Sequence, residues 1–216
     1  MDRDNITFSS WNKVAQRYAD AFMDLSHYNK SYTFFGKAFT NEKVRIVEIG
    51  CGPGNICRFV LEQHPTFQWR GYDVAPAMIS IAQQFNPSAY FEVQDCRNLS
   101  FITNEIDGII AGFCLPYFSE MEVELFLKEA HSKLAENGIL YISFVHGNPA
   151  QSGFMTGSTG DSMYFHYHDE LKMREMLNQI GYVIKYDEEI VFNPNPNRHE
   201  KHRIIIAQRV PASPAV

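Results

Sequence analysis

Cysteine is scarce in this chain, and its few thiols form no recognisable pair. Cys51, Cys57, Cys96 and Cys114 are widely spread, and no Cys-x-x-Cys pair occurs among them. Structural zinc sites need ligands at short, regular spacings, and disulfide frameworks belong to small secreted domains. Neither is indicated here, so we expect reduced thiols and no metal site.

Long hydrophobic runs and an excess of basic residues are also missing. The longest apolar stretch, GILYISFV (138–145), is far shorter than the roughly 20 residues that span a bilayer. The first residues, MDRD, lack the basic and then apolar pattern of a signal peptide. The net charge of -6 gives no broad basic surface for nucleic acid or anionic lipid. We therefore expect a cytoplasmic protein that binds neither a membrane nor nucleic acid.

The chain does have enough hydrophobic material for one folded domain. Hydrophobic residues make up 45% of the 216, and a chain of this length can bury a core without disulfides or metal ions. We predict a single domain over residues 1–210 and a flexible tail at 211–216, where the sequence reads PASPAV.

Strand-like apolar runs alternate with segments of helical period. Trp11, Tyr18 and Phe22 recur at helical spacing ahead of the first strand, with Ser9 or Ser10 available as an N-cap. The predicted strands are 44–49, 68–72, 89–93, 106–111, 139–145, 182–192 and 202–210. Helices between successive strands indicate a doubly wound, mostly parallel α/β sheet, and the loop NPNPN pairs the last two strands so that the last one is antiparallel.

The stretch IVEIGCGPGN, residues 46–55, places three glycines at alternate positions where the first strand should meet the first helix. Gly50, Gly52 and Gly54 carry no Cβ, so a ligand can come close to the backbone, whose N–H groups suit a carboxylate or phosphate. The ligand crevice of such a sheet lies at this edge. For these residues alone, a turn that needs glycine only for its dihedral angles stays an alternative.

Two nucleotide-binding patterns can be compared with this turn. The dinucleotide fingerprint GxGxxG requires glycine at position 55, which is Asn55. The phosphate loop GxxxxGK[ST] requires a Lys and a Ser or Thr that follow none of the three glycines. Triphosphate binding is thus disfavoured, and a nicotinamide oxidoreductase is a less favoured alternative.

Acidic residues follow the next two predicted strands. Asp73 ends the second strand, 19 residues beyond Gly54, where a carboxylate can accept hydrogen bonds from both hydroxyls of a ribose. Asp95 follows the third strand in FEVQDCRNL. Because these strand ends share one edge of the sheet, we expect a single site for a cofactor with a free ribose diol.

In these motifs the chain resembles the class I S-adenosylmethionine-dependent methyltransferases, from about Trp11 to Val210. VEIGCGPGN is similar to the family's first motif, and GYDVAPAMISIA, VQDCRNLSF, IDGIIAGFCLPYF and HSKLAENGILYISF are similar to the segments that follow it. The resemblance implies a seven-stranded Rossmann-like sheet and S-adenosylmethionine as cofactor. It also implies that residues 1–40 form an N-terminal helical lid.

The resemblance assigns the glycine turn to the amino-acid end of the cofactor. The residues that would form this cradle are Gly50, Cys51, Gly52 and Gly54. Glu48 would steady the turn through hydrogen bonds, since an unpaired carboxylate at the end of a buried strand is costly.

The resemblance assigns the acidic strand ends to the adenosine. Asp73 would hold the ribose diol, and Val74 and Met78 would flank the adenine. Asp95 would face the adenine amino group, with the backbone amide of Cys96 nearby.

Aromatic rings are expected around the reacting methyl group. Ring faces attract cations by roughly 0.5 to 2 kcal/mol in general cation–π contacts. Tyr18 of the lid, Phe113 and Tyr117 are candidates, and Gly112 precedes Phe113 in the predicted cofactor site. For Tyr18, a place in the core is an equally weighted alternative.

The segment 146–171 is the least regular in the chain and is predicted to form an acceptor-site loop. His146, His166 and His168 are candidate bases for a hydroxyl or ammonium acceptor. The family's small-molecule members often carry a polar residue where this chain has Leu115-Pro116, so no catalytic residue is assigned.

The sequence thus predicts a methyltransferase that transfers a methyl group from S-adenosylmethionine to a small-molecule acceptor. A non-catalytic protein that binds the cofactor or a partner is the alternative from another class.

Overall fold

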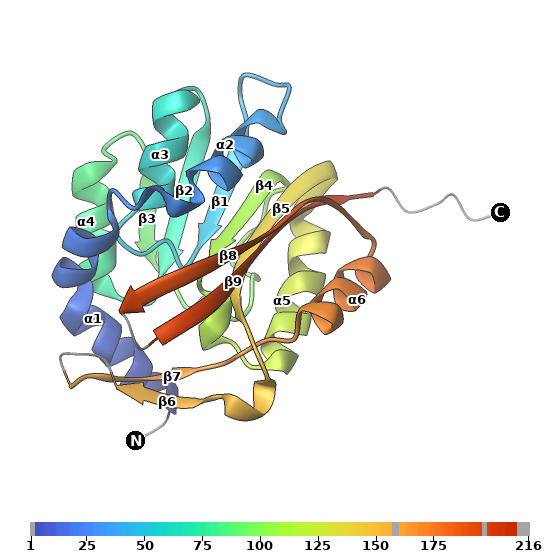
Figure 1. Ribbon diagram of the computed structural model, residues 1–216. Coiled ribbons are helices and arrows are strands. Elements are labelled where there is room, and N and C mark those ends of the chain that lie inside the picture. Colours follow the sequence, from blue (N-terminus) through green and yellow to red (C-terminus); the bar gives the residue numbers. More distant parts are fainter. Residues whose placement is uncertain (1–2, 157–159, 196–197, 211–216) are drawn as a thin grey trace.

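The computed structural model describes residues 3–156, 160–195 and 198–210, and its centre is a seven-stranded sheet (Figure 1). The strand order is β3-β2-β1-β4-β5-β9-β8. The strands are β1 (Arg45–Ile49), β2 (Gln68–Asp73), β3 (Tyr90–Val93), β4 (Ile106–Gly112), β5 (Leu134–His146), β8 (Tyr182–Asn195) and β9 (Arg198–Arg209). Neighbouring strands are parallel except at β9, which is antiparallel to β5 and β8. The predicted mostly parallel sheet with an antiparallel last strand is confirmed.

Alternate side chains of the strands enter two apolar layers. The helices are α1 (Arg3–Phe22), α2 (Asn29–Lys37), α3 (Asn55–Gln63), α4 (Pro76–Phe85), α5 (Glu120–Lys133) and α6 (Glu170–Ile180). Ile46 and Ile110 pack with α2 and α3, whereas Val47 and Ile109 pack with α5 and α6. Burying each such side chain stabilises the fold by about 1.5–3 kcal/mol, and both faces of the sheet are covered.

The helix signals of the sequence are largely realised. Ser119 and Glu122 form a capping box at the start of α5, and Pro76 lies in the first turn of α4. Asp169 caps α6, which ends at Gly181 with a positive φ of 104°. These local signals set the helix boundaries because each satisfies backbone groups that a helix end leaves unpaired.

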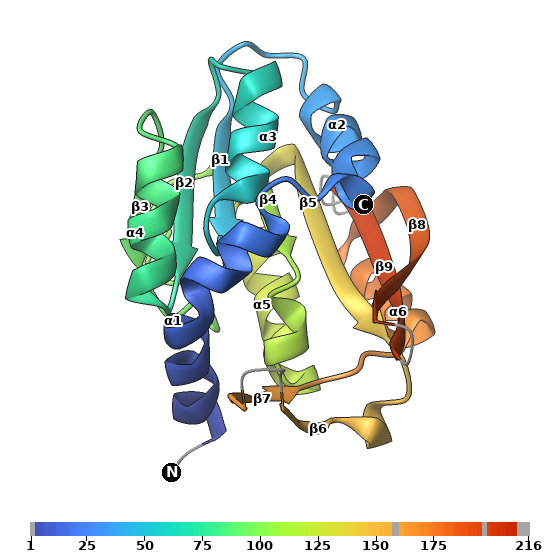
Figure 2. The same ribbon diagram turned by 60° about the vertical axis from the view of Figure 1, so that its left-hand side comes forward.

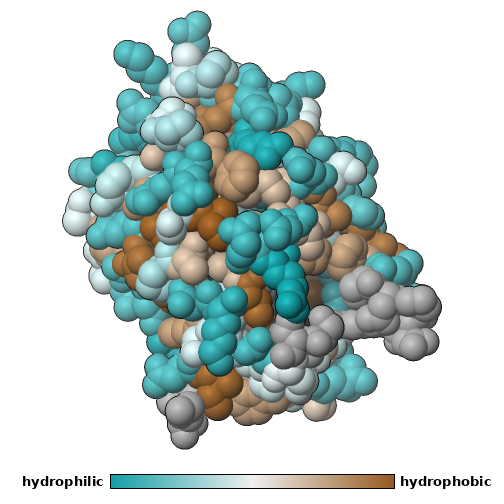
Figure 3. Space-filling view, turned by 90° about the vertical axis from the view of Figure 1, so that its left-hand side faces the viewer, coloured by the Kyte–Doolittle hydropathy of each residue, from teal (hydrophilic) through white to brown (hydrophobic). Residues whose placement is uncertain are grey.

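The helix α1 lies beside α4 and the hairpin β6–β7, at the carboxyl edge of the sheet (Figures 1 and 2). On the face that carries α4 and α1, the surface is mostly hydrophilic, with apolar side chains showing between polar ones (Figure 3). The proposed N-cap was wrong: α1 begins at Arg3, so Ser9 and Ser10 lie inside it. The hydroxyl of Ser10 instead donates to the carbonyl oxygen of Ser162 at 2.8 Å.

The segment 146–171 is more regular than the sequence suggested. It forms a hairpin of β6 (Gly153–Thr156) and β7 (Ser162–Phe165). The backbone N–H of Tyr164 donates to the Thr7 hydroxyl of α1 at 3.0 Å. Strands of four residues carry too little periodicity to be recognised in a sequence. This hairpin is also held by a hydrogen bond to α1, which comes from the other end of the chain.

The predicted lid and the predicted C-terminal tail stay predictions. Residues 3–40 of the predicted lid contain α1, the short helix η1 (Ser26–Tyr28) and α2, while closure of this segment stays a prediction. The predicted tail 211–216 lies outside the described residues. Within the described ranges, no helix is long and apolar enough to cross a membrane.

Candidate functional site

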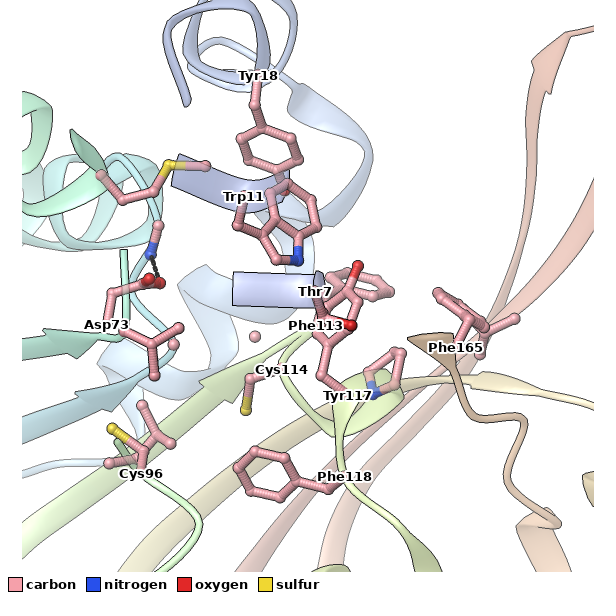
Figure 4. A pocket seen from close by; sticks show the side chains of 18 of the residues that line it. Thr7, Trp11, Tyr18, Asp73, Cys96, Phe113, Cys114, Tyr117, Phe118 and Phe165 are labelled. Carbon is pink, nitrogen blue, oxygen red and sulfur yellow. Dashed lines mark hydrogen bonds between the residues drawn. The ribbon is translucent and has the colours of Figure 1, made fainter. Parts of the chain in front are cut away.

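A cavity of about 230 Å³ lies at the carboxyl edge of the sheet, beneath α1 (Figure 4). Parallel strands bring their ends together there, and the antiparallel β9 contributes its beginning. The predicted site residues that line the cavity are Tyr18, Gly50, Gly52, Asp73, Val74, Met78, Asp95, Cys96, Gly112 and Phe113. One cavity therefore collects residues from five separate segments of the chain.

The glycine turn at the end of β1 has the left-handed backbone that favours glycine. The φ angles of Gly50 and Gly52 are 63° and 51°. A Cβ on Gly52 would meet only the ring of Tyr18, at 4.0 Å, whereas one on Gly50 would lie 2.5 Å from the Cβ of Cys114. Gly52 thus keeps open the space between the turn and Tyr18, and Gly50 permits close packing beneath it.

Asp73, at the end of β2, is hydrogen-bonded to this turn. Its carboxylate accepts hydrogen bonds from the backbone N–H of Gly52 and of Ala75, each at 2.9 Å (Figure 4). Burial raises the pKa of Asp73, and these backbone N–H groups partly counteract that rise. Because carboxylate oxygens have further lone pairs, Asp73 can bind the turn and still accept bonds from a ligand.

Asp95 lines the cavity with its carboxylate paired to Arg97. The Nε of Arg97 lies 3.0 Å from Oδ1 of Asp95, and Arg97 also pairs with Asp4 of α1. Burial raises the pKa of Asp95, but the hydrogen bonds and charge of Arg97 outweigh it and hold the pKa below its usual range. The sequence analysis did not identify Arg97, which joins the loop after β3 to α1.

Three predicted cofactor residues do not line this cavity. Gly54 caps α3 with a φ of 81°, whereas Cys51 and Glu48 line a smaller cavity that shares Gly50, Gly52 and Tyr18 with the first. Glu48 is 1% exposed, and its Oε2 accepts a hydrogen bond from the indole N–H of Trp69 at 2.9 Å. Burial raises the pKa of Glu48 to about 8. No bond from Glu48 to the glycine turn appears among the described residues.

Aromatic side chains form the upper wall of the cavity. The Trp11 ring packs edge-on against Tyr18 and Tyr117, with centroid distances of 5.1 and 5.5 Å, and Tyr117 packs against Phe165 of β7 (Figure 4). Burial, followed by the charge of Asp73, raises the pKa of Tyr18 to about 12. Phe113 has a φ of 58°, a backbone strain that proteins tolerate chiefly at functional sites.

The three candidate bases of segment 146–171 lie outside the cavity lining. The Nε2–H of His168 donates to the carbonyl oxygen of Leu115 at 2.8 Å, and burial lowers the pKa of His168. Burial and the charge of Arg3 lower the pKa of His166 to about 4. His168 is therefore engaged in holding the chain between β7 and α6 against the sheet.

A different histidine lines the cavity. His202 of β9 lies there with Glu200 and with Tyr28 of η1. The Nδ1 of His202 lies 2.7 Å from Oη of Tyr28, and its Nε2 lies 2.9 Å from Oε2 of Glu200. The available sequence signal was the pair Glu200 and His202, two residues apart at the start of an antiparallel strand, which places them on one face.

Metal ligation finds no support in the described ranges. Within residues 3–156, 160–195 and 198–210, no group of three or more His, Cys, Asp or Glu side chains could hold a metal ion. The four cysteines are free thiols.

Comparison with known proteins agrees with the motifs. Residues 46–138 match the methyltransferase domain family. Trans-aconitate 2-methyltransferase of Variovorax paradoxus is 31% identical over 47% of this chain and 38% of its own length. Malonyl-[acyl-carrier protein] O-methyltransferase 1 of Ilyobacter polytropus is 22% identical over 86% of this chain and 58% of its own. The chain thus spans between about two fifths and three fifths of these relatives.

Among solved structures, magnesium protoporphyrin IX methyltransferase of Synechocystis, with bound S-adenosylmethionine, shares the fold. Its TM-score is 0.73 at 17% identity, and the likeness covers 97% of this chain and 98% of that one. The family match over residues 46–138 covers less than half of the 216 residues, and the solved structure shares the fold of nearly the whole chain.

Proposed function

We propose that this protein transfers the methyl group of S-adenosylmethionine to a small molecule bound in the same cavity. The observation that carries the proposal is the meeting of the open glycine turn, the Asp73 carboxylate and the aromatic wall around one space. Each feature alone has a structural explanation. Their convergence fits a ligand with a polar tail, a ribose and a cationic sulfur.

The residues present fit this cofactor. The amino-acid end would lie over Gly50 and Gly52, where the space above Gly52 is open to the ring of Tyr18. Asp73 would accept bonds from the ribose hydroxyls, and Val74 and Met78 would contact the adenine. When bound, the cofactor supplies an electrophilic methyl group on sulfur.

Beyond the cofactor, the chain's task is to orient the acceptor and to exclude water. Trp11, Tyr117 and Phe165 supply apolar surface on the acceptor side. Holding two reactants in line can remove about 7–11 kcal/mol of a barrier in favourable cases. A small acceptor accords with the trans-aconitate named for one curated relative, and the net charge of -6 gives nucleic acid no support.

We also propose that residues 1–210 work as one domain in which residues 1–40 are the lid. The aromatic residues of α1 cover the cavity. The ion pair of Arg97 with Asp4 would keep α1 packed over it. The free thiols favour a reducing compartment such as the cytoplasm.

Ligand binding and labelled transfer test the proposed function. S-adenosylhomocysteine at 100 times its dissociation constant adds about 2.7 kcal/mol of stability, which raises the melting temperature of a chain of this size by roughly 5–10 °C. Methyl-tritiated cofactor and a metabolite panel should then give a labelled product. No shift at millimolar concentration overturns the proposal, and a shift with NAD(H) instead favours an oxidoreductase. Tight cofactor binding without transfer to any acceptor favours the non-catalytic alternative.

A further inference from the structure

We propose that Glu200, His202 and Tyr28 form a proton relay at the acceptor end of the cavity, and that the acceptor is an uncharged molecule with an ionisable hydroxyl, such as a phenol or an enol. The inference rests on the proposed methyl transfer. It names both the group that takes the acceptor's proton and the chemical class of the acceptor.

The two hydrogen bonds of His202 fix the direction of the relay. A carboxylate only accepts, so the Nε2 of a neutral His202 carries the hydrogen and donates to Glu200 at 2.9 Å. The Nδ1 is then the acceptor, and Tyr28 donates to it at 2.7 Å. A carboxylate behind an imidazole stabilises the imidazolium that forms when the imidazole takes a proton, as in hydrolase triads.

The sheet topology brings this relay to the cofactor end of the strands. Because β9 is antiparallel to β5, its first residues lie beside the carboxyl end of β5, and His202 is paired with Val145. Val145 itself lines the cavity. Tyr28 reaches the same place from η1, between the two helices of the predicted lid.

Aromatic rings pack against the imidazole of His202 on the side of the cavity that faces the cofactor. Phe192 stacks on the imidazole with a centroid distance of 5.0 Å, and Phe113 lies 4.7 Å from it. Phe113 directly follows Gly112 and also packs on Tyr28 at 4.9 Å. The strained backbone of Phe113 therefore puts one ring against both the imidazole and the phenol. His202 is 5% exposed, so water competes little for its hydrogen bonds.

The charges of the cavity favour a neutral acceptor over a carboxylate. Arg97 is the only Lys or Arg among the described lining residues, and it already pairs with Asp95 and Asp4. A carboxylate acceptor is ionised near neutral pH, so it needs no base, and it would meet the charge of Glu200. A phenol or enol keeps its proton near neutral pH and gains from a base, typically by 10²–10⁴-fold.

The proposed step balances in atoms and charge. The acceptor's O–H bond breaks as its proton passes to Oη of Tyr28, and the proton of Tyr28 passes to Nδ1 of His202. Burial raises the pKa of Tyr28, so the two transfers belong to one event rather than to a resting phenolate. The acceptor oxygen forms the new bond to the methyl carbon while the S–C bond breaks and its electron pair stays on sulfur. His202 later releases the proton to water.

Binding of 4-nitrophenol tests the relay without any turnover, because its absorption band reports its ionisation. At a pH where free nitrophenol is mostly neutral, nitrophenol bound to the wild type should show the phenolate band. His202→Gln should bind it as the neutral phenol, and Tyr28→Phe should reduce the phenolate fraction. His199→Gln is the matched control, since His199 is an exposed histidine of the same strand. Neutral nitrophenol on the wild type, or the same phenolate band on His202→Gln, would overturn the relay.

Methyl transfer gives the second readout. His202→Gln should lower kcat/KM for catechol by at least about 100-fold, and Glu200→Gln by about 10-fold, while the dissociation constant of S-adenosylhomocysteine changes less than twofold. Nitrophenol assayed at a pH where it is ionised should recover most of the rate of His202→Gln.

The two failures are distinguishable. If the wild type binds no S-adenosylhomocysteine, the proposed function itself fails. If it binds the cofactor product and methylates trans-aconitate but no phenol, only the acceptor class and the relay fail.

Discussion

The two ends of the cavity are built in different ways. At the cofactor end, the glycine turn directly follows β1, and Asp73 is the last residue of β2, the adjacent parallel strand. At the acceptor end, Tyr28, Phe165 and His202 come from segments far apart in the chain. The first end is a product of local chain geometry, whereas the second exists only once the whole domain has folded.

Under the proposed function, this difference separates the residues that bind the cofactor from those that select the acceptor. Short motifs at the strand ends would suffice to bind a sulfonium cofactor. The acceptor end can change through single residues on a helix, a hairpin or the start of β9 without disturbing the turn. Variants at the two ends should therefore affect cofactor and acceptor binding separately.

The largest effect is expected at Asp73. Asp73→Ala removes the carboxylate that would accept the ribose hydroxyls and that orders Gly52. With about 1.5–3 kcal/mol for each hydrogen bond to a charged group, affinity for S-adenosylhomocysteine should fall about 100-fold by calorimetry. Asp20→Ala, on the exposed side of α1, is the control. Equal affinities of the two variants would remove Asp73 from the site.

A smaller loss of cofactor affinity is expected at Gly52. Gly52→Ala puts a methyl group in the space below Tyr18 and adds left-handed strain at a φ of 51°. The two effects should weaken S-adenosylhomocysteine binding about 30-fold and lower the free energy of unfolding by about 1 kcal/mol. The control is Gly153→Ala, where a Cβ meets nothing within 4 Å. Unchanged binding would mean that the cofactor does not lie over the turn.

A variant at the acceptor end should weaken acceptor binding and leave cofactor binding unchanged. Phe165→Ala removes an apolar wall next to Tyr117, so the acceptor KM should rise about 10-fold, in line with the burial of one aromatic side chain. The dissociation constant of S-adenosylhomocysteine should stay within twofold. Phe154→Ala, on the same hairpin but 53% exposed, controls for damage to β6–β7. A parallel loss of cofactor affinity would break the proposed division into two ends.

The stability of the fold beneath the turn should depend on pH. Burial raises the pKa of Glu48 to about 8, above the roughly 4.3 of an unfolded glutamate. Neutral Glu48 thus contributes stability at low pH that is lost as pH rises from about 4.3 through 8. Glu48→Gln cannot ionise, so its free energy of unfolding relative to the wild type should increase by about 3–4 kcal/mol between pH 5 and pH 8, at about 1.36 kcal/mol for each pK unit. Urea melts of both proteins and of Glu62→Gln measure it, and a flat difference would contradict the raised pKa.

The sequence predicted the parts of the fold that local signals determine. The seven strands follow from the periodicity of the sequence. The caps of α5 and α6 are equally local, because each capping residue satisfies backbone groups next to it. Most of the predicted residues that line the cavity lie at or just after strand ends, where the sheet topology brings them together, and Tyr18 of α1 and Met78 of α4 are the exceptions.

The misses have a common physical cause. His202 was overlooked because its partner Tyr28 is 174 residues away, and the one local signal was Glu200, two residues before it. The start of α1 was misplaced because tertiary contacts, such as that of Ser10 with Ser162, take up the hydroxyl that would otherwise suit a cap. Glu48 is buried, and it accepts a hydrogen bond from Trp69 of the neighbouring strand rather than binding the turn.

A crystal structure with S-adenosylhomocysteine and a bound phenol tests the central claim most directly. The account expects the ribose hydroxyls within hydrogen-bonding distance of the Asp73 carboxylate, with the sulfur facing the side of the cavity that holds Phe113 and His202. Cofactor product bound elsewhere, or a phenol hydroxyl pointing away from Tyr28 and His202, would contradict it.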